Sequence, residues 1–234
     1  MKHQVIIENY EGKNNTSERY EKWKEFGYYK NLSTIWVTPT RGIMGTRVAF
    51  NWMNIIGGFN QPLAKLCVTG FEVGKAYNEA LVQILTNPVL AKFQYLLCVE
   101  EDNSAPPDGL LNLYTAIQEY DAVGGLYWTK GEAGVPMIWG DPKEPGTFVP
   151  QAPIKDSVQQ CNGLGMGFTL FRLDMFRNPG FEFGQWFKTT GDGKGNATTQ
   201  DLYFFLNAAK LGYKFACHTG VKCGHYDHEN GVWW

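Results

Sequence analysis

The most informative stretch of this sequence is Phe93-Gln94-Tyr95-Leu96-Leu97-Cys98-Val99-Glu100-Glu101-Asp102-Asn103. An apolar run of strand length ends there in three consecutive carboxylates, and the breaker Ser104-Ala105-Pro106-Pro107-Asp108 follows. In open α/β sheets, ligands bind at the carboxyl ends of the strands. Carboxylate oxygens suit a hard divalent cation, and such a cation suits a diphosphate. The same residues also fit a solvated acidic turn, because exposed acids in loops are ordinary.

Two similar units precede this stretch, and a helix follows it. A strand is predicted over 35–38, stopped by Pro39, with a helix after it that ends at Gly57-Gly58. A second strand is predicted over 64–69 and a second helix over 77–85. After the breaker, apolar residues recur at helical spacing at Leu110, Leu111, Tyr114 and Ile117. Three strand–helix units in succession are typical of a parallel, doubly wound sheet.

The second half of the chain is less regular. Strands are predicted over 122–128 and 168–171, and a late amphipathic helix is predicted to stop at Gly212. Turn residues dominate between 129 and 160, and loops of that length inside a compact domain are usually functional. A short charged helix is predicted over 17–26, after a polar lead-in. No repeat or clear linker interrupts the sequence, which predicts one domain.

Composition narrows the class of protein. Of the 234 residues 44% are hydrophobic, which is ample for a packed core and excludes a disordered chain. The net charge of −2 argues against a nucleic-acid partner, which usually requires a basic face. No run approaches the length of a transmembrane helix, and the amino terminus lacks the apolar region of a signal peptide. Because an odd number of cysteines, five, fits reduced thiols, we expect a cytoplasmic protein.

Four motifs, taken in order, resemble those of a known family. They are a strand ending in acid-x-acid, a glycine-rich segment leading into a strand, an Asp opening a late helix, and a His past the next strand. Together they resemble a GT-A-type glycosyltransferase of the inverting, family-two-like branch, from about Ile35 to His225. The resemblance implies an α/β GT-A fold, with a Rossmann-like, mixed, mostly parallel central sheet flanked by helices. It implies one domain over 1–234, with an N-terminal extension over 1–30, a nucleotide-sugar half over about 31–127 and an acceptor half over about 128–234.

The resemblance also implies roles for acidic residues. Val99-Glu100-Glu101-Asp102 resembles the DxD motif of the family, in which the last acid, here Asp102, binds Mn²⁺ or Mg²⁺ bridging the donor diphosphate. Glu100 stands where the first Asp is usual, and Glu101 could share its role. His225 matches a late His that completes the cation site. Asp201 resembles the general base, which must take the proton of the acceptor hydroxyl.

Further positions follow from the same resemblance. Thr38-Pro39 resembles the loop that meets the nucleotide base, and Lys75 and Asn78 match a helix start at which Tyr77 stands where Arg is common. The predicted nucleotide-sugar site comprises Thr38, Pro39, Arg41, Lys75, Asn78, Glu100 and Glu101. The predicted acceptor site comprises Gly165, Trp186 and Gln200.

Each of these residues also has a structural interpretation. Thr38-Pro39 could only end a strand, and Asn78 could only cap a helix. Asp201 could only interact favourably with the helix dipole in the first turn. Aromatic residues such as Trp186 are more often part of the core than stacked on a sugar. In the tail, His225 could be hydrogen-bonded in a turn, and the Cys and His residues of 217–228 could hold a structural zinc ion.

The sequence therefore predicts a metal-dependent glycosyltransferase of the hexosyltransferase type. It would move a sugar from a nucleoside diphosphate donor, UDP- or GDP-sugar, to a hydroxyl of a glycan or glycoconjugate, with inversion. One alternative is a retaining enzyme of the same fold, in which Asp201 orients substrate. Another is a sugar-phosphate nucleotidyltransferase, for which Pro39-Thr40-Arg41-Gly42 is a poor version of the required glycine-rich basic loop. A non-catalytic carbohydrate-binding protein would explain the aromatic residues but not the ordered acids.

Overall fold

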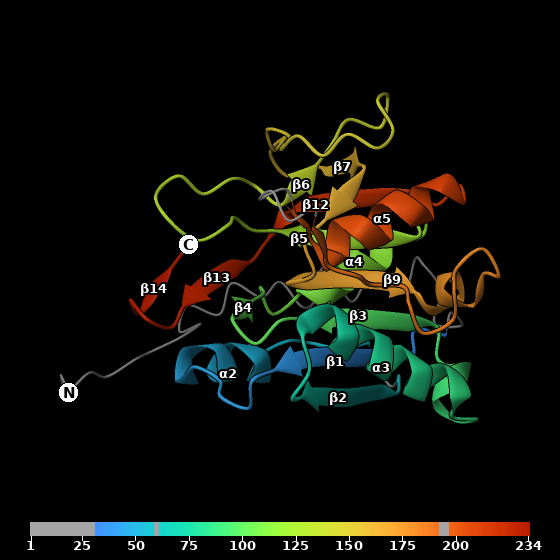
Figure 1. Ribbon diagram of the computed structural model, residues 1–234. Coiled ribbons are helices and arrows are strands. Elements are labelled where there is room, and N and C mark those ends of the chain that lie inside the picture. The colour runs from blue at the N-terminus through green and yellow to red at the C-terminus, as the bar shows by residue number, and fades with distance from the viewer. Residues whose placement is uncertain (1–30, 59–60, 192–196) are drawn as a thin grey trace.

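The computed structural model describes residues 31–58, 61–191 and 197–234. Within them, seven strands form the central sheet in the order β2-β1-β3-β9-β5-β12-β7 (Figure 1). Five of the seven point the same way, and β9 and β7 run against them. The predicted mixed, mostly parallel sheet is thus confirmed. The strands are β1 (Thr34–Thr40), β2 (Leu63–Thr69), β3 (Tyr95–Val99), β5 (Ala122–Leu126), β7 (Val158–Cys161), β9 (Phe168–Arg172) and β12 (Phe215–Lys222).

Helices cover both faces of this sheet (Figure 1). Residues of α3 and α5 pack into one buried cluster, and residues of α4 pack into a second cluster on the other face. The described helices are α2 (Thr46–Met53), α3 (Val73–Thr86), α4 (Gly109–Ala116) and α5 (Gln200–Lys210), with 3₁₀ turns at Leu90–Lys92 and Leu173–Arg177. The short strands are β4 (Asn103–Ser104), β6 (Ile138–Trp139), β8 (Gly163–Leu164), β10 (Thr190–Gly191), β11 (Ala197–Thr198), β13 (Gly224–Asp227) and β14 (Val232–Trp233).

The three predicted strand–helix units are confirmed, with two corrections at their ends. β1 continues through Pro39 to Thr40 instead of stopping before the proline. Proline is tolerated there because the pairing of β1 with β3 has already ended at Val37 and Cys98. The first helix, α2, ends at Met53 and does not reach Gly57. The helix predicted over 17–26 lies outside the described residues.

The face covered by α3 and α5 is held by an aromatic cluster around Phe204. The Phe204 ring lies 4.8 Å from Phe187 and 5.3 Å from Phe176, measured between ring centroids. Phe171, Phe181 and Phe205 lie within 5.6 Å of it as well. Stacked and edge-to-face rings of this kind combine large apolar burial with favourable ring geometry. This packing fixes α5 against the sheet and so fixes the position of its first turn.

All five cysteines of the chain have free thiols. Among the residues that the structure describes, no helix has both the length and the apolar character that crossing a membrane requires.

We expect Phe204→Ala to lower the free energy of unfolding by about 3–5 kcal/mol, because it leaves a cavity at the centre of the aromatic cluster. Phe183 is the matched control, since this residue is 59% exposed and its ring packs on Trp186, outside the rings that surround Phe204. Phe183→Ala should cost less than about 1 kcal/mol. Urea denaturation of both variants measures the difference, and equal losses would mean that the Phe204 cluster does not anchor α5.

Candidate active site

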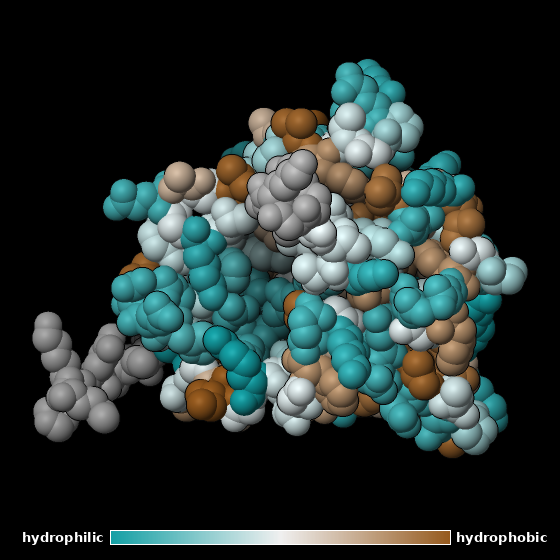
Figure 2. Space-filling model, viewed as in Figure 1, coloured by the Kyte–Doolittle hydropathy of each residue, from teal (hydrophilic) through white to brown (hydrophobic). Residues whose placement is uncertain are grey.

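Four parallel strands deliver polar residues to one edge of the sheet. β1 leads into Arg41, β3 into Glu100–Asp102, β5 into Lys130 and β12, through β13, into His225. Their side chains meet because the carboxyl ends of parallel strands lie at the same edge. The first turn of α5 is part of the same group, since the charge of Asp201 acts on Glu100. Figure 2 shows hydrophilic side chains around a hollow on this face, close to where Figure 1 places β4.

The C-terminal hairpin β13–β14 carries His225 to the acidic segment. β13 pairs with β4 in antiparallel register, Gly224 opposite Ser104 and His225 opposite Asn103. The Tyr226 N–H donates a hydrogen bond of 2.6 Å to the Asp102 carbonyl oxygen. Two backbone hydrogen bonds of 3.0 Å join His225 to Trp234 at the other side of the hairpin. The imidazole is therefore positioned from both sides by main-chain bonds.

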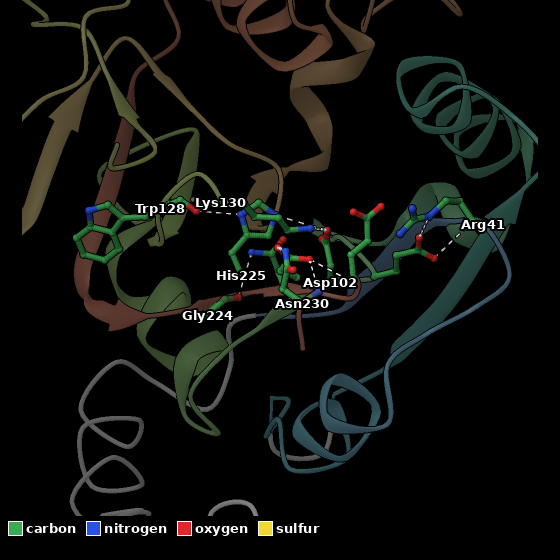
Figure 3. A network of polar contacts seen from close by, with 11 residues as sticks. Arg41, Asp102, Trp128, Lys130, Gly224, His225 and Asn230 are labelled. Atoms are coloured by element: carbon green, nitrogen blue, oxygen red, sulfur yellow. Dashed lines mark hydrogen bonds and ion pairs between the residues drawn. The ribbon is translucent and has the colours of Figure 1, made fainter. Parts of the chain in front are cut away.

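The Asp102 carboxylate has two cationic or basic neighbours (Figure 3). Its Oδ2 atom accepts a hydrogen bond from Lys130 Nζ at 2.5 Å and lies 3.5 Å from His225 Nε2. Burial alone would raise the pKa of Asp102, but His225 and Lys130 outweigh burial and bring the pKa down to about 2. Asp102 is thus a carboxylate at neutral pH, held against a lysine and a histidine.

The tautomer of His225 follows from its second contact. Its Nδ1 atom lies 2.9 Å from the carbonyl oxygen of Trp128. A carbonyl oxygen can only accept, so Nδ1 carries the proton, and in the neutral ring the Nε2 lone pair faces Asp102 Oδ2. The ring edge also packs on Tyr127, with centroids 5.5 Å apart. A histidine fixed by a backbone carbonyl through one nitrogen presents the other as a metal ligand.

These two side chains fit a divalent cation. A cation with ligands at about 2.1 Å and ligand angles of about 90–110° holds its ligand atoms about 3.0–3.4 Å apart, and the observed separation of Nε2 and Oδ2 is 3.5 Å. In the described part of the chain, no group of three or more His, Cys, Asp or Glu residues could hold a metal ion. The alternative of a structural zinc ion in 217–228 therefore lacks a ligand set. A cation at Asp102 would need further ligands from a substrate.

Glu101 organises the loop after β1. Its carboxylate accepts hydrogen bonds from the Thr40 hydroxyl at 2.5 Å and from the Arg41 N–H at 2.9 Å. The Arg41 Nε donates a third, at 2.5 Å, while the Arg41 side chain stays 73% exposed. Both carboxylate oxygens are engaged in this clamp. Figure 3 shows Arg41 on the opposite side of Asp102 from His225.

Glu100 follows β3 directly and is influenced by two other acids, Asp102 and Asp201. Burial raises the pKa of Glu100 most, and the charges of Asp102 and Asp201 raise it further, to about 8, while Lys130 acts in the opposite direction. The Glu100 N–H is bonded to the Gly167 carbonyl oxygen at 3.2 Å, which ties β3 to the glycine-rich segment. Burial, followed by the charge of Glu100, also raises the pKa of two tyrosines, Tyr77 and Tyr127.

Asp201 is buried in the first turn of α5. Its Oδ1 atom accepts a hydrogen bond from the Thr199 hydroxyl and another, of 2.9 Å, from the Leu202 N–H. Burial raises the pKa of Asp201 above its ordinary value, against the effect of these hydrogen bonds. A carboxylate with a raised pKa is a stronger base, so its environment suits proton abstraction as well as helix capping. Residues 192–196, which precede β11 and α5, lie outside the described residues.

The remaining predicted nucleotide-site residues fall into two groups. Thr38 and Pro39 are buried in β1, and the Thr38 hydroxyl accepts a hydrogen bond of 2.8 Å from the Trp36 indole. Lys75 and Asn78 line a cleft of about 350 Å³ between the start of α3 and residues 185–189. The Asn78 amide bonds both the N–H and the carbonyl oxygen of Phe187, at 3.0 and 2.7 Å, so it joins α3 to this segment.

The predicted acceptor residues lie in different settings. Gly165 is buried, and a Cβ there would overlap the Tyr127 hydroxyl, so glycine allows this tyrosine to reach the Gly167 N–H at 2.9 Å. Trp186 is 1% exposed, with its indole N–H bonded to the Phe176 carbonyl oxygen, and leaves no ring face for a sugar. Gln200 is the first residue of α5, and its Cβ lies close to Gly74 of α3. A Cβ added at Gly74 would lie 3.0 Å from the Gln200 Cβ, so the two helices approach closely at this point.

Lys130 was not among the predicted site residues. It follows Trp128 and Thr129 just past β5, a strand whose carboxyl end lies at the site edge. Its sequence position, a few residues after a strand that ends at the site edge, is the feature that could have predicted its presence in the site. The strand predicted over 122–128 is present as β5 but ends two residues earlier, at Leu126.

Known structures share this fold. The crystal structure of A197 from STIV matches with a TM-score of 0.58 and 17% identity, over 86% of this chain and 92% of that chain. The crystal structure of GalNAc-T7 with UDP, GalNAc and Mn²⁺ matches with a TM-score of 0.52 and 11% identity, over 84% of this chain and 44% of that chain. This chain thus spans less than half the length of the GalNAc-T7 chain. The fold is that of GT-A glycosyltransferases, as predicted. No protein-family model and no curated protein matches the sequence.

We expect Asp201→Asn to melt at a higher temperature than the wild type at pH 7. The unfolded chain ionises Asp201 freely above its ordinary pKa, whereas the folded protein resists ionisation because burial raises the pKa of this residue. The free energy of unfolding therefore falls as pH rises from the ordinary pKa of aspartate to the raised pKa of Asp201. Asparagine does not ionise, so the variant avoids this loss. The advantage should vanish at pH 3, where aspartate is protonated in both states.

Asp141→Asn, which removes an exposed carboxylate, is the control for the change in net charge. Thermal melts of both variants between pH 3 and pH 8 measure the effect. A large fall in melting temperature for Asp201→Asn at pH 7 would show that the ionised carboxylate stabilises the fold.

Proposed function

We propose that this protein is a metal-dependent, inverting glycosyltransferase of the hexosyltransferase type. Its donor is a nucleoside diphosphate sugar, UDP- or GDP-linked, and its acceptor is a hydroxyl group of a glycan or glycoconjugate. The supporting observation is the pair formed by Asp102 and His225, two basic atoms 3.5 Å apart at the carboxyl edge of a GT-A sheet. When His225 is neutral, both atoms carry a lone pair that a divalent cation between them could accept, and among the described residues no third His, Cys, Asp or Glu joins them.

A bound Mn²⁺ or Mg²⁺ would neutralise the charge that develops on the leaving diphosphate. Its remaining ligands would be diphosphate oxygens, as is usual for hard cations held by one or two side chains. Asp102 and His225 hold the cation in this proposal. Arg41, whose exposed side chain is held by Glu101, would meet the nucleotide. Thr38 and Pro39 are buried in β1 and would support this loop without touching the ligand, whereas Lys75 and Asn78 line the cleft at the start of α3.

Asp201 is the proposed base. It would take the proton from the acceptor hydroxyl as that oxygen attacks the anomeric carbon on the face opposite the diphosphate, which inverts the configuration. Burial supports this role, because it raises the pKa of Asp201 and keeps water away from the carboxylate. Gly165 and Gln200 would border the acceptor. In a retaining enzyme of the same fold, Asp201 would instead orient the substrate.

We expect binding of UDP or GDP to be strengthened by Mn²⁺ in the wild type and not in Asp102→Ala. The physical reason is the loss of one of two protein ligands. His225→Ala should weaken Mn²⁺ binding roughly tenfold or more, whereas His228→Ala, on the same hairpin, should change it by less than about threefold. Thermal shifts with each nucleotide, with and without Mn²⁺, measure the effect, because ligands that bind the native state raise its melting temperature. Undiminished Mn²⁺-dependent binding by folded Asp102→Ala would sink the metal assignment.

We expect Asp201→Asn to bind donor normally and to transfer sugar at least about a hundredfold more slowly, since the amide keeps the shape but cannot accept the proton. The wild-type product should carry the opposite anomeric configuration to the donor. Nucleotide release assays and NMR of the product test both points. Near-normal transfer, or a product of retained configuration, would favour the retaining mechanism. A protein that binds sugars but releases no nucleotide with any metal would be the carbohydrate-binding alternative.

A further inference from the structure

We propose that Lys130 and the divalent cation compete for the Asp102 carboxylate, so that cation binding releases the Lys130 ammonium toward the donor diphosphate. This inference rests on the proposed function, because it takes Asp102 as the cation ligand. It assigns a role to a residue that the motif pattern does not include.

The contested atom is a single oxygen. Lys130 Nζ lies 2.5 Å from Asp102 Oδ2, and His225 Nε2 faces the same Oδ2 from 3.5 Å (Figure 3). An ammonium at hydrogen-bond distance from this oxygen uses the same acceptor atom that a cation shared by Oδ2 and Nε2 would use. Two positive groups at this one oxygen repel each other strongly. Binding of one therefore opposes binding of the other.

Lys130 can leave while its partners stay. Asp102 and His225 are held by main-chain bonds to Tyr226 and Trp234, and His225 also by the Trp128 carbonyl. The lysine, by contrast, is attached by a flexible four-carbon stem, and its side chain is 33% exposed against 17% for Asp102. Rotation about side-chain bonds is enough to move the ammonium.

Lys130 lies in a turn that hydrogen bonds between Thr129 and Val135 hold together. The Thr129 N–H bonds the Val135 carbonyl oxygen at 2.9 Å, and the Val135 N–H bonds the Thr129 hydroxyl at 2.9 Å. Trp128 and Pro136 form a bridge at the base of this turn. The loop therefore keeps the Lys130 Cα beside the site in either state, and the released ammonium stays within reach of a ligand bound at Asp102.

The charge of the site favours the exchange. The charges of Asp102 and Asp201 raise the pKa of the buried Glu100, and Lys130, which is bonded to Asp102, acts in the opposite direction. The Arg41 guanidinium is bound to Glu101. When a divalent cation takes over the neutralisation of Asp102, the ammonium is left next to an incoming diphosphate, an anion for which a compact lysine charge is a suitable partner. Lys130 would thus neutralise the carboxylate before the cation arrives and bind the donor afterwards.

Mn²⁺ binding to the nucleotide-free protein tests the competition. The free ion is measured by electron paramagnetic resonance in the wild type, in Lys130→Met and in Lys143→Met. Lys143 is an exposed lysine, so its variant matches the loss of one positive charge. Loss of a competing ion pair should tighten Mn²⁺ binding roughly three- to tenfold in Lys130→Met. Lys143→Met should change it less than about twofold, since exposed charges at a distance are screened.

Binding of UDP and GDP at saturating Mn²⁺ tests the second part of the proposal, that the released Lys130 ammonium contacts the diphosphate. Lys130→Met should then bind the nucleotide several-fold more weakly than the wild type and Lys143→Met. If Asp102→Ala loses Mn²⁺ but Lys130→Met binds it no more tightly than the wild type, the competition is refuted while the metal assignment stands. If even the wild type binds no Mn²⁺, both the competition and the metal assignment fail. Unchanged nucleotide affinity in Lys130→Met would refute the transfer of the ammonium to the diphosphate.

Discussion

β13 meets β4 through two residue pairs, Gly224 with Ser104 and His225 with Asn103. This short pairing joins the first strand of the C-terminal hairpin to the segment that follows β3, more than a hundred residues earlier. It places the imidazole against the Asp102 carboxylate and lets the Asp102 carbonyl accept from Tyr226. The two cation ligands of the proposed site thus depend on a tertiary contact and not on their local sequence. A hairpin that slipped by one residue would turn His225 to the other face, because side chains alternate along a strand.

The acids of the site carry an electrostatic cost that the rest of the structure offsets. Burial raises the pKa of Glu100 most, and the charges of Asp102 and Asp201 raise it further. Lys130 and His225 relieve Asp102, backbone and hydroxyl donors relieve Asp201, and Glu101 is paired with Arg41. The aromatic packing around Phe204 keeps Asp201 in place despite its desolvation. Functional sites commonly store such unfavourable terms, and the large buried clusters on both faces of the sheet supply the compensating stability.

The parts of this arrangement that depend on periodicity could be predicted from the sequence. The apolar runs of β1 and β3 end in polar residues, and the rule that parallel strands share a carboxyl edge brings Arg41 and Asp102 together. Contacts between distant segments could not be predicted in this way. Glu101 and Asp102 are neighbours in one acidic run, yet one clamps Thr40 and Arg41 while the other faces His225. Trp186 illustrates the opposite error, because an aromatic residue near a site edge proved to be core.

Tyr127 links the two halves of the site mechanically. Its hydroxyl accepts from the Gly167 N–H, and its ring supports the edge of His225. The ring reaches this position because Gly165 has no Cβ to block it. Gly167 in turn accepts from the Glu100 N–H at 3.2 Å. The glycine-rich segment, which the sequence analysis assigns to the acceptor half, therefore contacts the tyrosine that packs on His225. A shift of this segment would disturb His225 through Tyr127, because buried side chains that touch on several sides cannot move independently.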